Sequence, residues 1–143
     1  MRIFTIIALM PLVFLSACKN PSLPKNTSQA DQPPLGSTVK PVDATAMMEL
    51  ITQTSNIQIL DLRTPAEFAA GHIKGSTNID FKSPRFADNI DKLDKRPAYI
   101  LYCRSGNRSR KSLETFKKHP FGTIYHLEGG FNAWQASGNP VEK

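Results

Sequence analysis

From about residue 39 onward, apolar residues recur with two spacings that predict short strands alternating with helices. Continuous or alternating apolar runs predict strands at 57–62, 98–102 and 123–127. Apolar residues at helical spacing, preceded by capping or turn residues, predict helices that begin near Asp43, Thr64, Ser83, Ser109 and Phe131. Strands joined by helices through short connections form a parallel sheet that helices cover on both faces. We therefore expect one α/β domain over residues 39–143.

The first 38 residues follow a different pattern. After Met1 and Arg2, an almost uninterrupted apolar run extends to Ala17. It is shorter than the roughly 20 residues that span a bilayer, and it is typical of a signal peptide over residues 1–17. Residues 15–18 (Leu-Ser-Ala-Cys) resemble the lipobox of bacterial lipoproteins, which implies cleavage before Cys18 and attachment of acyl chains such as palmitate to it. Residues 18–38 contain four prolines and few large apolar residues, so we expect a flexible tether.

The lipobox resemblance also implies a location. The mature protein would be held at a membrane by its lipid anchor. Lys19 follows Cys18, at the position where lipoproteins retained in the inner membrane carry aspartate. The implied protein is a cell-envelope lipoprotein, and in a Gram-negative host it would lie in the outer membrane and face the periplasm.

Cysteine and charge counts narrow the classes of protein. The 143 residues include two cysteines, Cys18 and Cys103, which excludes a disulfide-rich scaffold and a zinc site of several cysteines. A lipidated Cys18 leaves Cys103 without a partner inside the chain. There are 18 Lys and Arg against 12 Asp and Glu, a net charge of +6, and removal of Arg2 with the signal peptide leaves 17 against 12, or +5.

The loop after the strand at 98–102 carries the candidate chemistry. Its residues are Cys103, Arg104, Ser105, Gly106, Asn107 and Arg108. Open α/β sheets bind ligands at the carboxyl ends of their strands. Backbone N–H groups of the loop and the positive end of the next helix dipole would stabilise a thiolate at Cys103 and bind an anion.

Basic residues around this loop also indicate an anion site. Cations are disfavoured at the N-terminus of a helix, and a bound anion would resolve that conflict. We expect Arg104 and Arg108 to bind the anion. For Arg110 and Lys111, a role as solvated surface charges is an equal alternative. For Cys103, the alternative is a small buried apolar residue.

Motifs spread along the domain resemble the single-domain rhodaneses. In chain order they are Asp61-Leu62-Arg63, Glu67-Phe68, Gly71-His72-Ile73-Lys74-Gly75-Ser76, Asn78-Ile79, the segment 103–109, and Gly129-Gly130-Phe131 with Trp134. One departure is Ser76, where alanine is commoner. The resemblance covers residues 39–143 and implies a three-layer α/β/α domain around a five-stranded, mainly parallel sheet.

The resemblance implies a sulfurtransferase that needs no cofactor. Cys103 would take the outer sulfur of a small anionic donor such as thiosulfate, and would pass it from a persulfide to cyanide or a thiol. Residues 104–108 would bind the donor, and the loop amides would hold the persulfide. Because the loop is expected at the surface, exclusion of water should matter little. We expect a monomer.

The other motif residues are expected to support the structure. Asp61 and Arg63 would fix the loop after the second predicted strand, with Arg63 paired to Glu67 four residues later. His72 is expected to be a hydrogen-bonded structural histidine, whereas His119 and His126 lie outside the motifs. Phe131 and Trp134 are expected in the core.

Three other functions are alternatives to sulfur transfer. Phosphatases and arsenate reductases also bind oxyanions with Cys and Arg, but the four residues between Cys103 and Arg108 make a shorter loop than in cysteine phosphatases. A non-catalytic rhodanese-fold binding module stays open, because a retained cysteine does not prove turnover. Nucleic-acid binding is disfavoured, since the basic residues form no stripe interleaved with aromatics. No cluster of residues at ligand spacing predicts a metal site.

Overall fold

The computed structural model describes residues 37–143. The predicted signal peptide (1–17), the predicted lipid attachment at Cys18 and almost all of the predicted tether lie outside the described residues. The first strand begins at Thr38, one residue before the predicted start of the domain. Within residues 37–143, no helix is long and apolar enough to cross a membrane.

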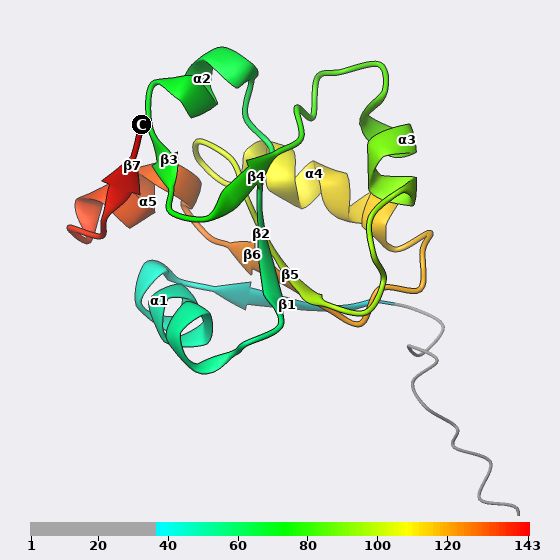
Figure 1. Cartoon of the computed structure of the whole chain (residues 1–143), viewed down its shortest axis with the longest axis horizontal. Coiled ribbons are helices and arrows are strands. Elements are labelled where there is room, and N and C mark those ends of the chain that lie inside the picture. Colours follow the sequence, from blue (N-terminus) through cyan, green and yellow to red (C-terminus); the bar gives the residue numbers. More distant parts are fainter. Residues whose placement is uncertain (1–36) are drawn as a thin grey trace, which may run out of the picture.

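Strands and helices alternate along the described chain (Figure 1). In order, the elements are β1 (Thr38–Val42), α1 (Ala44–Gln53), β2 (Ile57–Asp61), α2 (Pro65–Ala69), β3 (His72–Ile73), β4 (Ser76–Asn78), α3 (Phe86–Asp91), β5 (Ala98–Tyr102), α4 (Asn107–Phe116), β6 (Thr123–Leu127), α5 (Gly130–Ala136) and β7 (Val141–Glu142).

The main sheet has five strands in the order β1-β6-β5-β2-β4, and every neighbouring pair is parallel. This confirms the predicted parallel sheet. β5 is the middle strand, with Ile100 in register with Ile59 of β2 and Tyr125 of β6. The short strands β3 and β7 form a separate antiparallel pair. The central position of β5 brings the loop that follows it to the middle of one end of the sheet.

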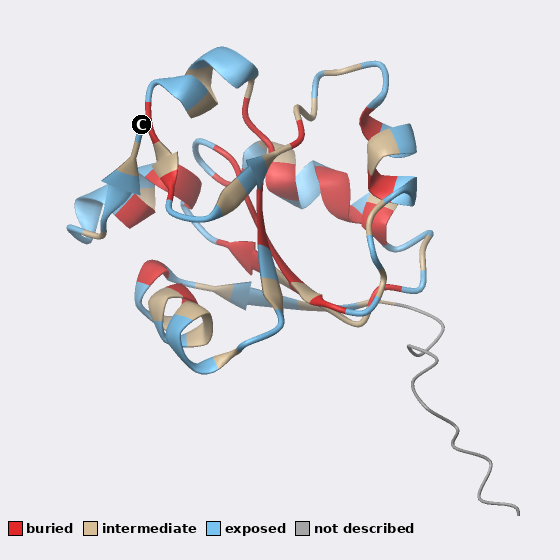
Figure 2. Ribbon diagram, viewed as in Figure 1, coloured by how far each residue is buried: buried red, intermediate tan, exposed pale blue. Residues whose placement is uncertain are grey.

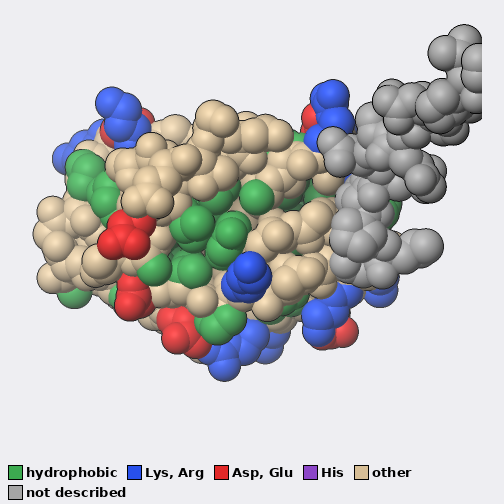
Figure 3. Space-filling view, turned by 90° about the horizontal axis from the view of Figure 1, so that it is seen from below, with side chains coloured by type: hydrophobic (Ala, Val, Ile, Leu, Met, Phe, Trp, Pro, Cys, Tyr) green, Lys and Arg blue, Asp and Glu red, His purple; other side chains and the backbone are tan. Residues whose placement is uncertain are grey.

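Two apolar cores lie on opposite faces of the sheet, which confirms the predicted three layers. Leu101 of β5 belongs to the core that contains residues of α3 and α4, and Ile100 belongs to the core that contains residues of α1 and α5. Buried residues follow the central strands and the inner faces of the helices (Figure 2). Seen from below, apolar side chains gather at the centre of the surface, with charged side chains around them (Figure 3).

The predicted helix starts are partly confirmed. Asp43 caps α1 by accepting a hydrogen bond from the Ala46 N–H at 2.8 Å. α3 begins at Phe86 instead of Ser83, because residues 83–85 form a turn in which the Ser83 carbonyl accepts from the Phe86 N–H. α4 begins at Asn107 instead of Ser109, so Arg108 lies in the first turn of the helix.

The predicted capping box at α2 is present. The Thr64 side chain accepts from the Glu67 N–H at 3.3 Å, and the Glu67 carboxylate accepts from the Thr64 N–H at 3.0 Å.

Thr64→Ala removes the side-chain acceptor of this capping box and is expected to lower the free energy of unfolding by about 1 kcal/mol, measured by urea unfolding. Thr52→Ala is the matched control, because Thr52 is exposed inside α1 and caps no helix. An equal loss in both variants would contradict the capping role.

Candidate active site

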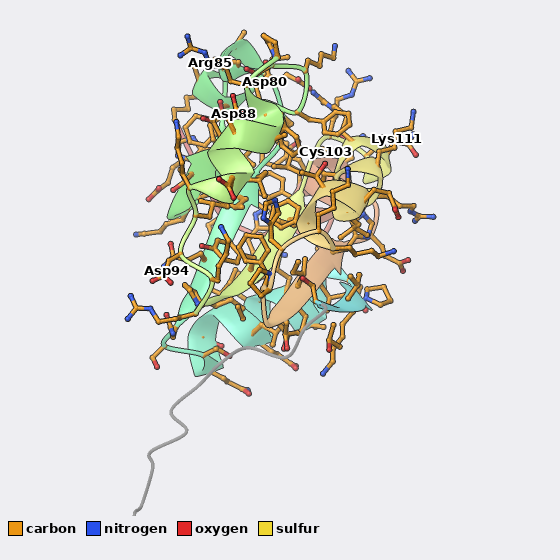
Figure 4. All side chains as sticks on the ribbon, turned by 90° about the vertical axis from the view of Figure 1, so that its right-hand side faces the viewer. Asp80, Arg85, Asp88, Asp94, Cys103 and Lys111 are labelled. Atoms are coloured by element: carbon orange, nitrogen blue, oxygen red, sulfur yellow. The ribbon has the colours of Figure 1, made fainter. Side chains whose placement is uncertain are left out.

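The Cys103 loop joins β5 to α4 at the carboxyl end of the middle strand. Gly106 is the N-cap of α4 and has a φ of 89°, in the left-handed region that favours glycine. Figure 4 shows Cys103 inside the fold beside the start of α4, whereas Lys111 projects from the surface of the same helix. A short turn of this kind directs the backbone N–H groups of the loop toward its interior.

Two carbonyl groups of the loop accept hydrogen bonds from backbone N–H groups of α5. The Phe131 N–H donates to the Cys103 carbonyl at 2.8 Å, and the Asn132 N–H donates to the Arg104 carbonyl at 3.0 Å. This contact requires Gly130, since a Cβ there would lie 2.2 Å from the Cys103 carbonyl oxygen. The sequence placed Gly130 only in a turn. Its contact with the loop depends on residues far apart in the chain, so no local pattern indicates it.

The sulfur of Cys103 is buried, with the residue only 1% exposed. Burial is the largest single influence and raises the pKa of the thiol. The backbone N–H groups of Ser109, Ser105 and Arg108 and the Ser109 hydroxyl lower it, and because their combined effect exceeds that of burial, the pKa of Cys103 is below the usual value. The Ser109 hydroxyl lies 3.8 Å from the sulfur. The loop itself lies at the surface, as expected, because Arg104, Ser105 and Asn107 are exposed, whereas the Cys103 sulfur is buried beneath it.

A lowered thiol pKa predicts a shifted pH profile for alkylation. Because the thiolate reacts, the rate at which iodoacetamide modifies Cys103 should rise with pH through a midpoint below that of free cysteine. The rate is followed by mass spectrometry of the peptide that contains Cys103. Ser109→Ala removes one donor to the sulfur and should move the midpoint upward. A wild-type midpoint at or above that of free cysteine would contradict this account.

Glu67 and Arg108 form an ion pair beside the loop, although 41 positions separate them in the chain. The two guanidinium NH groups donate to the two carboxylate oxygens at 2.8 and 2.7 Å. The Arg108 guanidinium is the main cause that lowers the pKa of Glu67, which falls to about 2 despite the opposing effect of burial. The predicted pair between Arg63 and Glu67 is wrong, since the carboxylate of Glu67 faces α4.

Arg63 pairs instead with Asp61 in a buried cluster. Asp61 is 0% and Arg63 3% exposed, and the Arg63 Nε donates to both Asp61 oxygens at 3.0 and 2.9 Å. The guanidinium also donates to the Gly71 carbonyl at 2.7 Å and lies 4.0 Å from the centroid of the Phe131 ring. The cluster links the end of β2 to α5, which in turn holds the Cys103 loop. This arrangement fits the supporting role expected for Asp61 and Arg63.

A hollow of about 390 Å³ lies against the outer side of the loop. It is lined by Thr64, Glu67, Lys82, Arg104, Ser105 and Arg108. Three of the predicted binding residues therefore come together around the hollow: Arg104, Ser105 and Arg108. The other two do not line it, since Asn107 is exposed elsewhere and Gly106 is buried. Lys82 was not predicted. It comes from the connection after β4, and no motif in the neighbouring sequence indicates a site there.

His126 is a second residue that the sequence did not connect to the site. It is buried on β6, and its Nε2 lies 3.1 Å from the Gly106 carbonyl oxygen. The same carbonyl accepts from the Ser109 hydroxyl at 3.1 Å and the Arg110 N–H at 2.9 Å. His126 thus helps to hold the loop, and only the pairing of β6 with β5 brings it there.

Four other residues considered in the sequence do not line the hollow beside the loop: His72, Arg110, Lys111 and Trp134. His72 is hydrogen-bonded to the Phe68 carbonyl at 3.2 Å and stacks on the Phe68 ring, as expected for a structural histidine. Trp134 is buried in the core, as predicted. Arg110 and Lys111 are exposed, and Arg110 approaches Glu128 at 4.0 Å. Within residues 37–143, no group of three or more His, Cys, Asp or Glu residues is placed to hold a metal ion.

The chain thus carries a buried cysteine with a lowered pKa in a loop at the end of the middle strand of an α/β/α domain, which is the setting of a reactive thiol. The family model described as the Rhodanese-like domain matches residues 43–137. The chain belongs to this family.

Similar proteins include several with sulfurtransferase names. Thiosulfate sulfurtransferase GlpE of Pseudomonas aeruginosa (strain LESB58) is 38% identical over 79 residues, which cover 55% of this chain and 70% of that protein. A protein named sulfurtransferase from Allochromatium vinosum is 27% identical over 103 residues, which cover 72% of this chain and 94% of that protein. The uncharacterized protein YqhL of Bacillus subtilis is 40% identical over 77 residues, and the match covers 54% of this chain and 60% of that protein's length.

Solved structures of rhodanese-related proteins have the same fold. A rhodanese-related protein from Thermoplasma volcanium superposes with a TM-score of 0.64 at 27% identity, over 72% of this chain and 97% of that chain. The thiosulfate sulfurtransferase of Pseudomonas aeruginosa gives a TM-score of 0.57 at 25% identity, over 76% of this chain and 19% of that one.

Proposed function

We propose that this protein is a sulfurtransferase that moves a sulfane sulfur from a small anionic donor such as thiosulfate to a thiophilic acceptor through a persulfide on Cys103. The observation that carries the proposal is the buried Cys103 sulfur, which faces backbone N–H groups of residues 105, 108 and 109 and has a lowered pKa. The sulfurtransferase names of similar proteins support the same reaction.

The first half-reaction loads the cysteine. The Cys103 thiolate attacks the outer sulfur of thiosulfate and forms an S–S bond. The bond between that sulfur and the sulfonate group breaks, and sulfite leaves with the electron pair. The terminal sulfur of the persulfide then carries the negative charge. The N–H groups that stabilise the thiolate are suited to stabilise this anion, in the manner of an oxyanion hole.

The second half-reaction returns the enzyme to its starting state. Cyanide or a thiolate attacks the terminal sulfur, the S–S bond breaks, and Cys103 leaves as a thiolate. Cyanide becomes thiocyanate, whereas a thiolate becomes a persulfide. Donor and acceptor react in turn with the same sulfur, so the kinetics should be ping-pong. The chain is proposed to work as a monomer.

Steady-state kinetics test the proposal. Thiocyanate formation from thiosulfate and cyanide should give parallel lines in double-reciprocal plots at several fixed cyanide concentrations. An aryl phosphate serves as the competing substrate. Phosphate release without thiocyanate formation would replace the proposal by a phosphatase, and absence of both activities would favour a binding module.

We also propose that the chain is exported and anchored through acyl chains on Cys18, in the outer membrane facing the periplasm when the host is Gram-negative. This proposal rests on the sequence of residues 1–19. Expression in a bacterial host with a labelled fatty acid should give a labelled, processed protein in the membrane fraction. Cys18→Ala should remain unprocessed and unlabelled. Equal labelling of both proteins would contradict lipidation at Cys18.

A further inference from the structure

Three basic side chains line the hollow beside the Cys103 loop, and a carboxylate neutralises one of them. Arg108 is neutralised, because both of its terminal NH groups are bonded to the Glu67 carboxylate. Within residues 37–143, by contrast, neither the Lys82 ammonium nor the Arg104 guanidinium lies within 4.0 Å of a carboxylate oxygen, and the Asp80 carboxylate accepts from the backbone N–H of Lys82 instead. The hollow therefore offers two unpaired cations and one paired cation to an incoming anion.

We propose that Lys82, together with Arg104, binds the anionic group of the sulfur donor, and that Glu67 sets the charge selectivity of the hollow by neutralising Arg108. This inference rests on the proposed function and specifies its donor class: a small anion whose charged group lies away from the sulfur to be transferred. Glu67 acts through Arg108, so it is a positioning residue for the reaction.

The position of the ion pair explains why its charge matters. Glu67 and Arg108 both line the hollow, and their side chains are only 28% and 18% exposed. Solvent screens partly buried charges less than exposed ones, so the carboxylate opposes entry of an anion. A donor that carries two negative charges meets Lys82 and Arg104 without competition, whereas Glu67 competes with it for Arg108.

Glu67 also caps α2, and the test must separate this role from its charge. Glu67→Gln is suitable because glutamine at the same position of a capping box keeps the hydrogen bond to the Thr64 N–H. It removes the negative charge and one acceptor for Arg108. Lys82→Gln removes a cation from an exposed side chain and leaves the fold intact. Lys92→Gln is the matched control, since Lys92 is also exposed and does not line the hollow.

Alkylation of Cys103 measures charge selectivity without any sulfur transfer. Iodoacetate is an anion and iodoacetamide is neutral, so the ratio of their rates, divided by the same ratio for free glutathione, reports attraction of anions. Lys82→Gln should lower the ratio on the order of threefold at low salt, and Glu67→Gln should raise it by a similar factor. Lys92→Gln should leave it unchanged. High salt should shrink both changes.

Thiosulfate kinetics provide the second measurement. Glu67→Gln should lower the KM for thiosulfate, with little change in kcat, whereas a purely structural role would lower kcat and the melting temperature together. Unchanged alkylation ratios in Glu67→Gln and Lys82→Gln would overturn the inference, and so would a Cys103 that neither reagent modifies. Absence of thiosulfate turnover with shifted ratios would overturn the proposed function alone.

Discussion

Cys103→Ser is expected to abolish sulfur transfer, with a loss on the order of 10³-fold or more in turnover with thiosulfate and cyanide. The serine hydroxyl is not ionised at neutral pH, and it cannot carry a sulfur atom as a persulfide. The fold should persist, because serine differs from cysteine by one atom and the same loop N–H groups can bond its oxygen. The free energy of unfolding should change by less than about 2 kcal/mol.

Cys18→Ser is the matched control for this loss. It replaces the other cysteine of the chain, outside the described residues, and should retain transfer when the purified proteins are compared in solution. Thiocyanate formation and thermal unfolding are measured for both variants. Activity retained in Cys103→Ser, or lost equally in both variants, would contradict Cys103 as the residue that carries sulfur.

Gly130→Ala has the second-largest expected effect, because the added methyl group enters the backbone of the loop. Its Cβ would lie 2.2 Å from the Cys103 carbonyl oxygen and 2.8 Å from the Gly106 nitrogen, and the φ of 59° already disfavours an L-residue. Relief of this clash requires α5 to separate from the loop, with loss of two hydrogen bonds. We expect a loss of about 3 kcal/mol or more in unfolding free energy, and a rise in the pKa of Cys103 as its donors move.

Gly138→Ala separates steric conflict from backbone strain. Gly138 has a φ of 71°, but a Cβ there would meet nothing within 4 Å. Gly138→Ala should therefore lower the free energy of unfolding only by the backbone cost of about 1 kcal/mol, and the reactivity of Cys103 should not change. Urea unfolding and the pH profile of alkylation are measured for both variants. Equal behaviour of the two would contradict the close packing of α5 on the loop.

The strands and helices that form the cores could be predicted from the sequence, because burial imposes a local pattern. β5 is a continuous apolar run since both of its faces are covered, and Asp43 and Thr64 mark helix starts with capping side chains. The sequence pattern does not predict β1 and β4, because both lie at the edges of the sheet, where residues stay exposed or partly exposed and apolar spacing is weak; β4 also has only three residues.

The site could be predicted only where its residues are neighbours in the chain. The loop from Cys103 to Arg108 was located from its own sequence. The pairing of Arg108 with Glu67 depends on how α2 sits against α4, and a local helical spacing rule wrongly assigned Glu67 to Arg63. Lys82 likewise reaches the hollow only through tertiary structure, so its contribution required the structure.

Mass spectrometry after incubation with thiosulfate shows whether Cys103 carries the transferred sulfur. The protein is incubated without an acceptor, digested under non-reducing conditions and mapped. The peptide that contains Cys103 should gain the mass of one sulfur atom, and dithiothreitol should remove it. No gain on that peptide, or a gain confined to another residue, would rule out a persulfide on Cys103.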